Sequence, residues 1–379
     1  MKVCEDSEYR TAPDHARAVT FQMASDFAAR LIAWQKIHGR HGLPWQNTRD
    51  PYRIWLSEIM LQQTQVATVI PYYLRFLESF PDIASLASAS EDDVLAHWSG
   101  LGYYSRARNL HAAAQAIMER HGGHFPMSFE DIMELPGIGR STAAAISVFA
   151  FGQHRAILDG NVKRVFARQF GIEGYPGEAR AMAQMWERAE AELPETDLEA
   201  YTQGLMDLGA TVCTRSRTSC GVCPVSATCV ALATDRVNEL PHRKPVKALP
   251  LKQTVMLIIQ NRGEIMLEKR PSTGVWGGLW CFPEMPVDVA DVQGFCKRQW
   301  GLDARAGESM PLLTHGFTHF RLDIMPQRIY AFDESPRVAE PGQLWMHPED
   351  ALQAAIPTPV RKLLMALTDG PLFGGHSRL

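Results

Sequence analysis

The length, composition and charge of the chain limit what it can be. Its 379 residues are 46% hydrophobic and 21% charged, which is typical of a globular protein of about two or three domains. Nothing in it approaches the roughly 18 consecutive apolar residues of a membrane span, and its acidic N-terminus lacks the apolar core of a signal peptide. The net charge of −4 argues against binding nucleic acid by bulk positive charge but leaves room for a local basic face.

The first part of the chain has the pattern of an all-α domain. Apolar residues recur at helical spacing, as at Phe27, Leu31 and Trp34, and turn signals such as FPD, HGGHFP and LPGIG separate the helical runs. We therefore predict a mainly α domain over residues 25–234. The preceding residues 1–24 contain no recognisable motif, and we treat them as a tail.

A change in composition separates this domain from a second one. Residues 235–250 are polar and rich in proline, which predicts an interdomain linker. The following run, QTVMLIIQNRGEIMLEKR, predicts a β-hairpin around an Asn-Arg-Gly turn. Further strands are predicted within HGFTHFRLDI and QRIYAF. The sequence thus predicts a smaller α+β domain over residues 251–370.

Four of the seven cysteines lie in one short segment. They are Cys213, Cys220, Cys223 and Cys229, separated by six, two and five residues. Disulfides are disfavoured in a long chain without an export signal, and four thiolates can hold either zinc or a 4Fe–4S cluster. Because the gap of six exceeds the roughly two to four residues of a zinc knuckle, we predict a 4Fe–4S cluster rather than zinc or free thiols. The compartment should be reducing, and we expect a cytoplasmic location, close to the nucleoid if the source is bacterial.

A single acidic residue, Glu58, interrupts the apolar run WLSEIMLQQTQV. On a helix its side chain shares a face with Ile54 and Leu61. A carboxyl among apolar neighbours has a raised pKa, which suits a general acid. The alternative is that Glu58 sits at the edge of the apolar stripe and reaches water.

A glycine-rich turn precedes an alanine-rich helix in LPGIGRSTAAA. Gly137 and Gly139 allow another backbone to approach closely, and the helix that starts near Ser141 presents free N–H groups. We predict a helix–hairpin–helix that grips phosphate, although any tight connection between helices also uses glycine.

A second carboxylate, Asp159, opens the run DGNVKRV after an apolar segment. It could simply cap the following helix. As a functional group, it would be held ionised by backbone N–H groups and would act together with Glu58. A raised-pKa carboxyl and an ionised one form the pair used to cleave glycosidic bonds.

Basic residues gather in the same region. Residues 140–168 carry a net charge of +4, and Arg215 and Arg217 stand within the cysteine segment. This predicts a basic stripe that contacts a DNA backbone, with scattered solvated arginines as the alternative.

Together these motifs resemble a known superfamily. The runs LPGIGRSTAAAI and LDGNVKRV and the cysteine spacing resemble helix–hairpin–helix DNA glycosylases, whose two lobes enclose a DNA-binding cleft. LPWQNTRDPYRIWLSEIMLQQTQVATVIPYY and GLGYYSRARNLH are similar to the adenine DNA glycosylase (MutY) family rather than to endonuclease III. The resemblance runs from about residue 25 to the end of the chain. It implies removal of adenine mispaired with 8-oxoguanine, and we expect also with guanine, from double-stranded DNA in base excision repair.

The resemblance implies a role for each catalytic group. Glu58 matches the acid that protonates the flipped adenine at N7, and Asp159 matches the carboxylate that stabilises the oxocarbenium sugar, with a transient covalent step. Asn161 stands where it would orient that carboxylate. The base must leave the helical stack first, because its scissile bond is inaccessible in a duplex.

Other positions match residues that contact DNA. Gln63 and Tyr103 match side chains that wedge into DNA around the 8-oxoguanine, and Trp45 and Gln203 match the region of the adenine pocket. Ser141 stands where bifunctional relatives have the lysine that forms a Schiff base, and serine cannot form one. We therefore expect a monofunctional enzyme that leaves an abasic site, in which Lys163 traps a Schiff base only weakly.

The second domain resembles the Nudix-like domain that this family uses to recognise 8-oxoguanine. GVWGGLWCFPE is similar to a Nudix segment, but VDVADVQGFCKRQWGL follows without the acidic cluster that would bind a divalent metal. Phe317, Thr318 and His319 match a Phe-Ser-His loop that contacts 8-oxoguanine, with threonine replacing serine. From residue type alone, Phe317 would be a core residue and His319 a surface residue.

Two alternative functions stay open at this point. One is an oxidised-pyrimidine glycosylase with lyase activity, which Ser141 and the second domain disfavour. The other is a non-catalytic iron–sulfur DNA-binding protein, in which Glu58 and Asp159 would be superfluous. We expect a monomer without membrane contact, in which the cluster orders the Arg215–Arg217 segment against phosphate.

Overall fold

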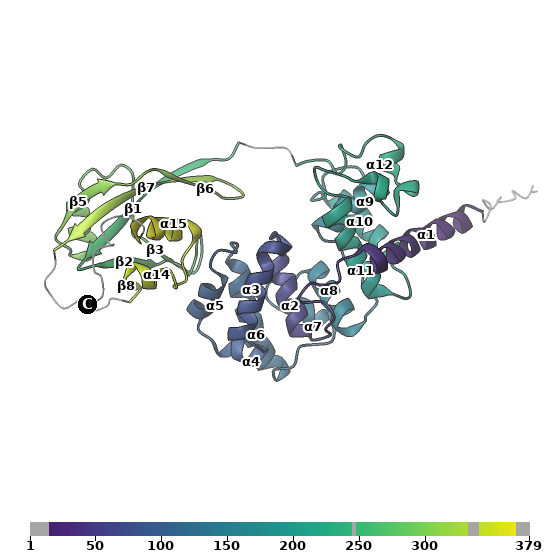
Figure 1. The fold of residues 1–379 in the computed structure, drawn as a ribbon, viewed down its shortest axis with the longest axis horizontal. Coiled ribbons are helices and arrows are strands. Elements are labelled where there is room, and N and C mark those ends of the chain that lie inside the picture. The colour runs from purple at the N-terminus through teal and green to yellow at the C-terminus, as the bar shows by residue number, and fades with distance from the viewer. Residues whose placement is uncertain (1–14, 245–247, 333–340, 369–379) are drawn as a thin grey trace, which may run out of the picture. The chain divides into compact units, whose positions relative to one another are not determined.

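The computed structural model describes residues 15–244, 248–332 and 341–368 (Figure 1). The chain forms two compact units. Unit 1 combines the chain up to Glu58 with Pro126–Glu134 and the segment that begins at Ile138 and includes the cysteines. Unit 2 combines Ile59–Phe125 and Leu135–Gly137 with the C-terminal part of the chain.

Unit 1 is helical around an aromatic and aliphatic core. Phe27 of the first helix packs against Phe166 and Tyr201, with ring centroids 6.1 and 6.4 Å apart, and all three side chains are buried. The helices are α1 (His15–His38), α2 (Pro51–Leu61, which continues into unit 2), α7 (Phe129–Glu134), α8 (Arg140–Phe151), α9 (Gly160–Gln169), α10 (Ala179–Ala191), α11 (Leu198–Asp207) and α12 (Val230–Ala233).

The helical part of unit 2 shows the caps that its sequence suggests. Its helices are α3 (Val66–Ser79), α4 (Ile83–Ser88), α5 (Glu91–Trp98) and α6 (Ser105–His121). Asp82 and Ser90 accept backbone hydrogen bonds at the starts of α4 and α5, and Gly122 ends α6 in the left-handed conformation that glycine adopts readily. The mainly α character predicted for this part of the chain is confirmed.

The C-terminal domain is built on an eight-stranded sheet. Its strands are β1 (Leu251–Asn261), β2 (Glu264–Lys269), β3 (Trp280–Cys281), β4 (Glu284–Met285), β5 (Ala304–Ser309), β6 (Leu313–Gly316), β7 (Arg321–Ala331) and β8 (Gln343–Met346). The path runs β3-β2-β1-β7-β5, with β4, β6 and β8 paired at its sides, and β1 and β7 are parallel. The helices are α13 (Val292–Trp300), α14 (Pro348–Ala351) and α15 (Thr358–Thr368). On one face, Cys296 of α13 packs with Leu257 and Ile329 of the sheet.

Two features of this domain refine the predictions. The hairpin around Asn-Arg-Gly is confirmed, with antiparallel β1 and β2 joined by Arg262 and Gly263, both at positive φ as a tight hairpin turn requires. The run HGFTHFRLDI is not one strand, because residues 317–320 form a turn closed by the Phe317 N–H donating to the Phe320 carbonyl at 2.9 Å.

The first part of the predicted linker, residues 235–244, is partly packed rather than free. Leu240 is only 1% exposed, and its carbonyl accepts a 2.8 Å hydrogen bond from Nε of Arg168. Arg236 forms ion pairs with Glu173 and Glu239. The segment before residue 245 therefore belongs to the helical unit.

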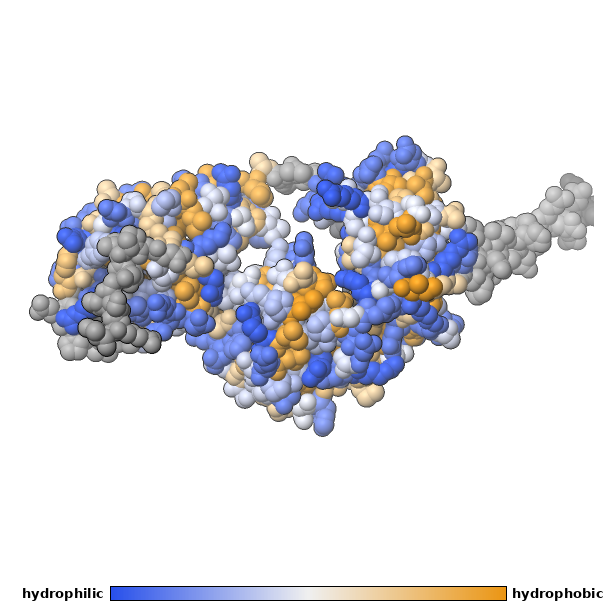
Figure 2. Space-filling view, viewed as in Figure 1, coloured by the Kyte–Doolittle hydropathy of each residue, from blue (hydrophilic) through white to orange (hydrophobic). Residues whose placement is uncertain are grey.

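The surface is mixed in character. Figure 2 shows apolar residues broken up by hydrophilic ones on the face drawn. None of the helices in the described part of the chain has the length and apolar character of a membrane-spanning segment.

Candidate active site

Glu58 occupies the last turns of α2, a helix whose other side chains are mostly buried. Its neighbours Ile54, Trp55 and Ile59 are 3% exposed or less, whereas Glu58 itself is half-buried. The packed surroundings remove water from the carboxyl, and this desolvation raises the pKa of Glu58 to about 8. Glu58 therefore combines the raised pKa that we predicted with the limited exposure that a ligand would need.

Asp159 caps α9, as the simpler interpretation of the sequence proposed. Its Oδ1 accepts a 2.7 Å hydrogen bond from the backbone N–H of Val162, and the amide of Asn161 lies 3.5 Å from Oδ2. Burial raises the pKa of Asp159, while the N–H groups and the cations Arg164 and Lys163 act in the opposite direction. Desolvation is the largest of these effects, and the expectation that backbone N–H groups hold Asp159 ionised stays a prediction.

The two carboxyl groups interact electrostatically although 101 positions separate Glu58 from Asp159 in the sequence. The negative charge of Asp159 is the second cause of the raised pKa of Glu58. A like charge nearby favours the protonated form of the group with the higher pKa. The charge of Asp159 therefore adds to desolvation in favouring the protonated form of Glu58.

Asn161 is held by an arginine one turn further along α9. Nη2 of Arg164 donates to Oδ1 of Asn161 at 2.8 Å and to the carbonyl of Gly209 at 2.5 Å. Nε of Arg164 donates to the carbonyl of Cys213 at 2.8 Å. Gly209 lies in a π-helical turn, Leu208–Val212, and a Cβ there would come within 2.5 Å of Cβ of Asn161. The close packing at Gly209 fixes Asn161 against the start of the cysteine segment.

The sequence alone identified Arg164 as a positive charge but not as the partner of Asn161. Arg164 follows Asn161 by three residues, so helical spacing places the two side chains on one face of α9. That spacing was the available signal, but the partners at Gly209 and Cys213 come from tertiary structure.

Ser141 connects the start of α8 with the segment that leads to Asp159. Its Oγ accepts a 2.9 Å hydrogen bond from the backbone N–H of Leu158. Lys163 is half-buried, and desolvation lowers its pKa while Asp159 opposes the change. Because Leu158 directly precedes Asp159, the hydrogen bond to the hydroxyl of Ser141 holds the backbone beside Asp159 in place.

The glycines of the turn before α8 differ in their surroundings. Gly137 has a φ of +79°, and a Cβ there would come within 2.7 Å of Cβ of Asn109. Gly139 is exposed, and a Cβ there would meet no atom of the protein within 4 Å. The positive φ and the contact with Asn109 explain why glycine is needed at position 137. At Gly139 the surface of the turn is free of other protein atoms and could be approached by a ligand.

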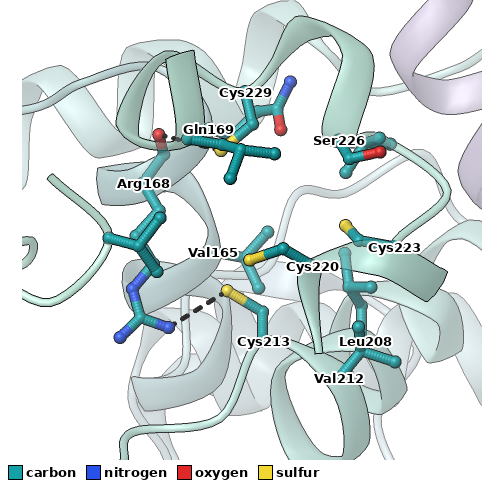
Figure 3. A pocket seen from close by; sticks show the side chains of 13 residues that line it. Val165, Arg168, Gln169, Leu208, Val212, Cys213, Cys220, Cys223, Ser226 and Cys229 are labelled. Atoms are coloured by element: carbon teal, nitrogen blue, oxygen red, sulfur yellow. Dashed lines mark hydrogen bonds between the residues drawn. The ribbon is translucent and has the colours of Figure 1, made fainter. Parts of the chain in front are cut away.

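The four clustered cysteines line one cavity, together with residues of α9 and the π-helical turn (Figure 3). Nη1 of Arg168 lies 3.3 Å from Sγ of Cys213, and Sγ of Cys229 lies 3.5 Å from the carbonyl of Arg168. None of the four forms a disulfide. Arg215 and Arg217, between the first two cysteines, are exposed.

The donor set fits an iron–sulfur cluster, because thiolates are its usual ligands and four of them share this cavity. In the described residues, no group of three or more His, Cys, Asp or Glu side chains is arranged so that it could hold a metal ion. The fold thus gathers the cysteines in one place without arranging them around a single ion.

A scan against protein families matches two regions of the chain. Residues 56–191 match the HhH-GPD superfamily of base excision DNA repair proteins, and residues 254–366 match the NUDIX domain. An adenine DNA glycosylase of Buchnera aphidicola subsp. Schizaphis graminum is 34% identical over 339 residues, which cover 89% of this chain and 97% of that protein. One of Homo sapiens is 31% identical over 399 residues, covering 89% and 73%.

The chain belongs to the adenine DNA glycosylase family. It is an enzyme of base excision repair that cleaves N-glycosidic bonds, and the family predicted from the motifs is confirmed. A solved thermostable thymine-DNA glycosylase has 28% identity and a TM-score of 0.53, covering 57% of this chain and 99% of that one. The predicted fold, a helix–hairpin–helix glycosylase domain followed by a Nudix-like domain, is confirmed as well.

The basic residues predicted to form a stripe differ in their surroundings. Arg140 pairs with Glu190, and Arg155 lies 3.9 Å from Glu130. Arg168 is 4% exposed and directs its guanidinium inward. Arg168 therefore cannot contribute to a surface stripe, and DNA contact by the other basic residues stays a prediction.

The two predicted DNA wedges share an unusual backbone conformation. Gln63 has a φ of 59° and Tyr103 a φ of 50°, and both side chains are exposed. Side chains disfavour this left-handed region, and such residues concentrate at functional sites. The backbone is therefore consistent with a special role at both positions.

The two positions assigned to the adenine pocket are both in unit 1. Trp45 is 8% exposed. Gln203 is half-buried and donates through Nε2 to Oδ1 of the buried Asp207 at 2.8 Å. Asp207 also forms an ion pair with Arg40. The role of Trp45 and Gln203 in binding adenine stays a prediction.

The predicted 8-oxoguanine loop is the turn between β6 and β7. Phe317 is half-buried and stacks on Phe320, with ring centroids 4.4 Å apart and an angle of 21° between the planes. Thr318 and His319 are exposed. Behind them, the ring of the buried Trp276 lies 5.5 Å from that of Phe317. The turn thus exposes two polar side chains next to a group of packed aromatic side chains.

Proposed function

We propose that this adenine DNA glycosylase flips adenine out of a mispair with 8-oxoguanine, or with guanine, and removes it by hydrolysis without cutting the strand. The observation that carries the proposal is the pair of carboxyl groups: the pKa of Glu58 is raised to about 8, and Asp159 contributes to the increase. Cleavage of an N-glycosidic bond needs these two roles, a proton donor for the leaving base and a carboxylate that stabilises the sugar cation.

Glu58 acts as the acid in this mechanism. With a pKa of about 8, its carboxyl is largely protonated at neutral pH and can donate to N7 of an extruded adenine. Protonation matters because adenine leaves poorly as an anion. The partly exposed position of Glu58 gives the base access to the proton.

Asp159 stabilises the positive charge that develops on the deoxyribose when the base leaves. The cap at Val162 and the contact with Asn161 fix the direction of the carboxylate. Water then reaches the sugar, either directly or after a transient bond between Asp159 and the sugar, and an abasic site results.

Strand cleavage is not part of this proposal. Ser141 accepts a hydrogen bond from Leu158, and a hydroxyl cannot form the imine that a lyase requires. Lys163 has a lowered pKa and can trap a sugar aldehyde slowly.

The four cysteines would hold a 4Fe–4S cluster with a structural role. When bound, the cluster would fix the loop that carries Arg215 and Arg217, both exposed and able to contact phosphates. A purified protein that absorbs at about 400 nm and contains iron is expected; a colourless, zinc-loaded protein would contradict the assignment.

The C-terminal domain would read the 8-oxoguanine through Phe317, Thr318 and His319. Their turn offers a hydroxyl, an imidazole and an aromatic ring, which suits stacking and hydrogen bonding to a base. The enzyme would act as a monomer on double-stranded DNA.

The test uses duplexes with adenine opposite 8-oxoguanine, guanine or thymine, and thymine opposite guanine. Strand breaks should appear only after alkali treatment, and fastest for adenine opposite 8-oxoguanine. Glu58→Gln should bind that duplex but release little adenine, whereas Glu78→Gln, an exposed control on α3, should stay fully active. Full activity of Glu58→Gln, or preferred release of thymine, would refute the proposal.

A further inference from the structure

A buried arginine, Arg106, joins two separate turns of unit 2. It lies at the start of α6 and is 7% exposed. Its guanidinium donates to five backbone carbonyls and one hydroxyl. Nη1 contacts the carbonyls of Ile59 (2.9 Å), Met60 (2.8 Å) and Gln62 (2.6 Å), and Nη2 contacts Oγ1 of Thr64 (3.1 Å) and the carbonyls of Leu101 (3.5 Å) and Gly102 (3.1 Å).

Burying this cation is costly, since a charged group loses its hydration when it enters the protein. Burial lowers the pKa of Arg106 to about 10. The carbonyl dipoles of the two turns compensate for the lost water. A planar guanidinium can donate hydrogen bonds to acceptors on two sides at once, whereas the ammonium group of lysine does this less well.

The two turns carry Gln63 and Tyr103, both with exposed side chains and positive φ. The carbonyls of Gln62 and Gly102 belong to the peptide units directly before these residues. Hydrogen bonds to these carbonyls orient both peptide planes and so restrict φ of Gln63 and of Tyr103. One side chain therefore supports both unfavourable backbone conformations.

Arg106 also contacts the ring of Tyr103. Its Cζ lies 5.5 Å from the centroid of that ring and 5.3 Å from that of Trp98. Nε1 of Trp98 donates to the carbonyl of Gly102 at 3.2 Å, so a second buried side chain holds the same peptide unit. The side chain of Tyr103 is 45% exposed, while these contacts hold the backbone just before it in place.

We propose that Arg106 is a positioning residue that holds Gln63 and Tyr103 together in a DNA-binding arrangement before DNA arrives. The inference rests on the proposed function and on the expectation from the sequence that these two side chains enter the duplex beside the mispair. A preorganised pair does not have to be ordered at the moment of binding, and preorganisation increases affinity. Arg106 thus contributes to lesion discrimination without touching DNA.

The first measurement compares affinities of the full chain for two duplexes. One contains an uncleavable 2′-fluoro-2′-deoxyadenosine opposite 8-oxoguanine, and the other is undamaged. Arg106→Lys should reduce the ratio of the two affinities by about tenfold, equivalent to about 1.4 kcal/mol. Arg120→Lys, at an exposed position of the same helix, should leave the ratio unchanged. An unchanged ratio in Arg106→Lys would overturn the inference.

A double-mutant cycle separates positioning from general destabilisation. In a background with Gln63→Ala and Tyr103→Ala, Arg106→Lys should cause little further loss of discrimination, because its targets are gone. A loss as large as in the wild-type background would contradict the proposed role.

Hydrogen exchange of the free protein gives a readout without DNA. Arg106→Lys should speed amide exchange at residues 61–64 and 101–104 more than in α8. Equal acceleration in both places would indicate a merely structural role and overturn the inference. Failure of the proposed function looks different: the wild-type protein itself would then not prefer the duplex with 8-oxoguanine.

Discussion

Arg164 donates a 2.8 Å hydrogen bond from Nη2 to the side-chain oxygen of Asn161. The same guanidinium contacts the carbonyls of Gly209 and Cys213. One side chain therefore connects the proposed catalytic segment with the beginning of the cysteine segment.

Replacing Arg164 tests this connection. Arg164→Lys keeps the charge but cannot bond Asn161 and both carbonyls at once. We expect adenine release to slow by about 10- to 100-fold, by analogy with the loss of a partner that orients a metal-binding side chain. Single-turnover rates on the duplex with adenine opposite 8-oxoguanine measure the effect, with Arg180→Lys on α10 as the exposed control. Wild-type rates in Arg164→Lys would show that the bridge is dispensable.

The pH dependence of adenine release follows from Glu58. In the proposed mechanism the protonated carboxyl is the active form. Because the pKa of Glu58 is raised to about 8, the rate should fall as the pH increases through about 8. Between pH 6 and 7 it should change little, if Glu58 alone controls it. Single-turnover rates at saturating enzyme report this dependence. A rate that increases from pH 7 to 9 would contradict the role of Glu58 as an acid.

The same shift affects stability. In the unfolded chain Glu58 has its usual pKa of 4.5, and folding raises it to about 8, so the folded state loses stability as the pH increases through this interval. Glu58→Gln removes this cost, and its melting temperature should exceed that of the wild-type protein at pH 9 but not at pH 4. Thermal unfolding at both values checks this, and an identical difference at the two pH values would show that ionisation of Glu58 is not responsible.

In the proposed mechanism, Ser141 is the residue that limits the enzyme to hydrolysis without strand cleavage. Ser141→Lys should create a lyase, because an amine at this position can form an imine with the sugar. Losing the hydrogen bond to Leu158 should also slow adenine release. Strand breaks without alkali and trapping by borohydride are the readouts, with Thr142→Lys as the neighbouring control. Equal strand cleavage by the two variants would contradict the claim that an amine must stand at position 141 to form the imine.

The sequence was most informative where chemistry depends on local spacing. The cysteine gaps and the turn before α8 could be located without a structure. So could Asp159 at the start of a helix, because caps, turns and ligand spacings are properties of short segments. The hairpin at Asn261–Gly263 was found for the same reason.

Features that depend on distant partners could not be predicted. Arg140 faces Glu190, and Arg106 collects carbonyls from residues more than 40 positions away. The raised pKa of Asp159 reflects burial by the whole unit. In HGFTHFRLDI, the alternation of apolar residues hid a turn that only the pairing of β6 with β7 reveals.

The central claim is that Glu58 and Asp159 act on the same nucleotide in one transition state. The most direct measurement is the single-turnover rate of adenine release by the wild-type protein, Glu58→Gln, Asp159→Asn and the double variant, all on adenine opposite 8-oxoguanine. If the two groups act together, the double variant should be scarcely slower than the slower single variant. Losses that multiply in the double variant, or near wild-type activity of either single variant, would contradict the account.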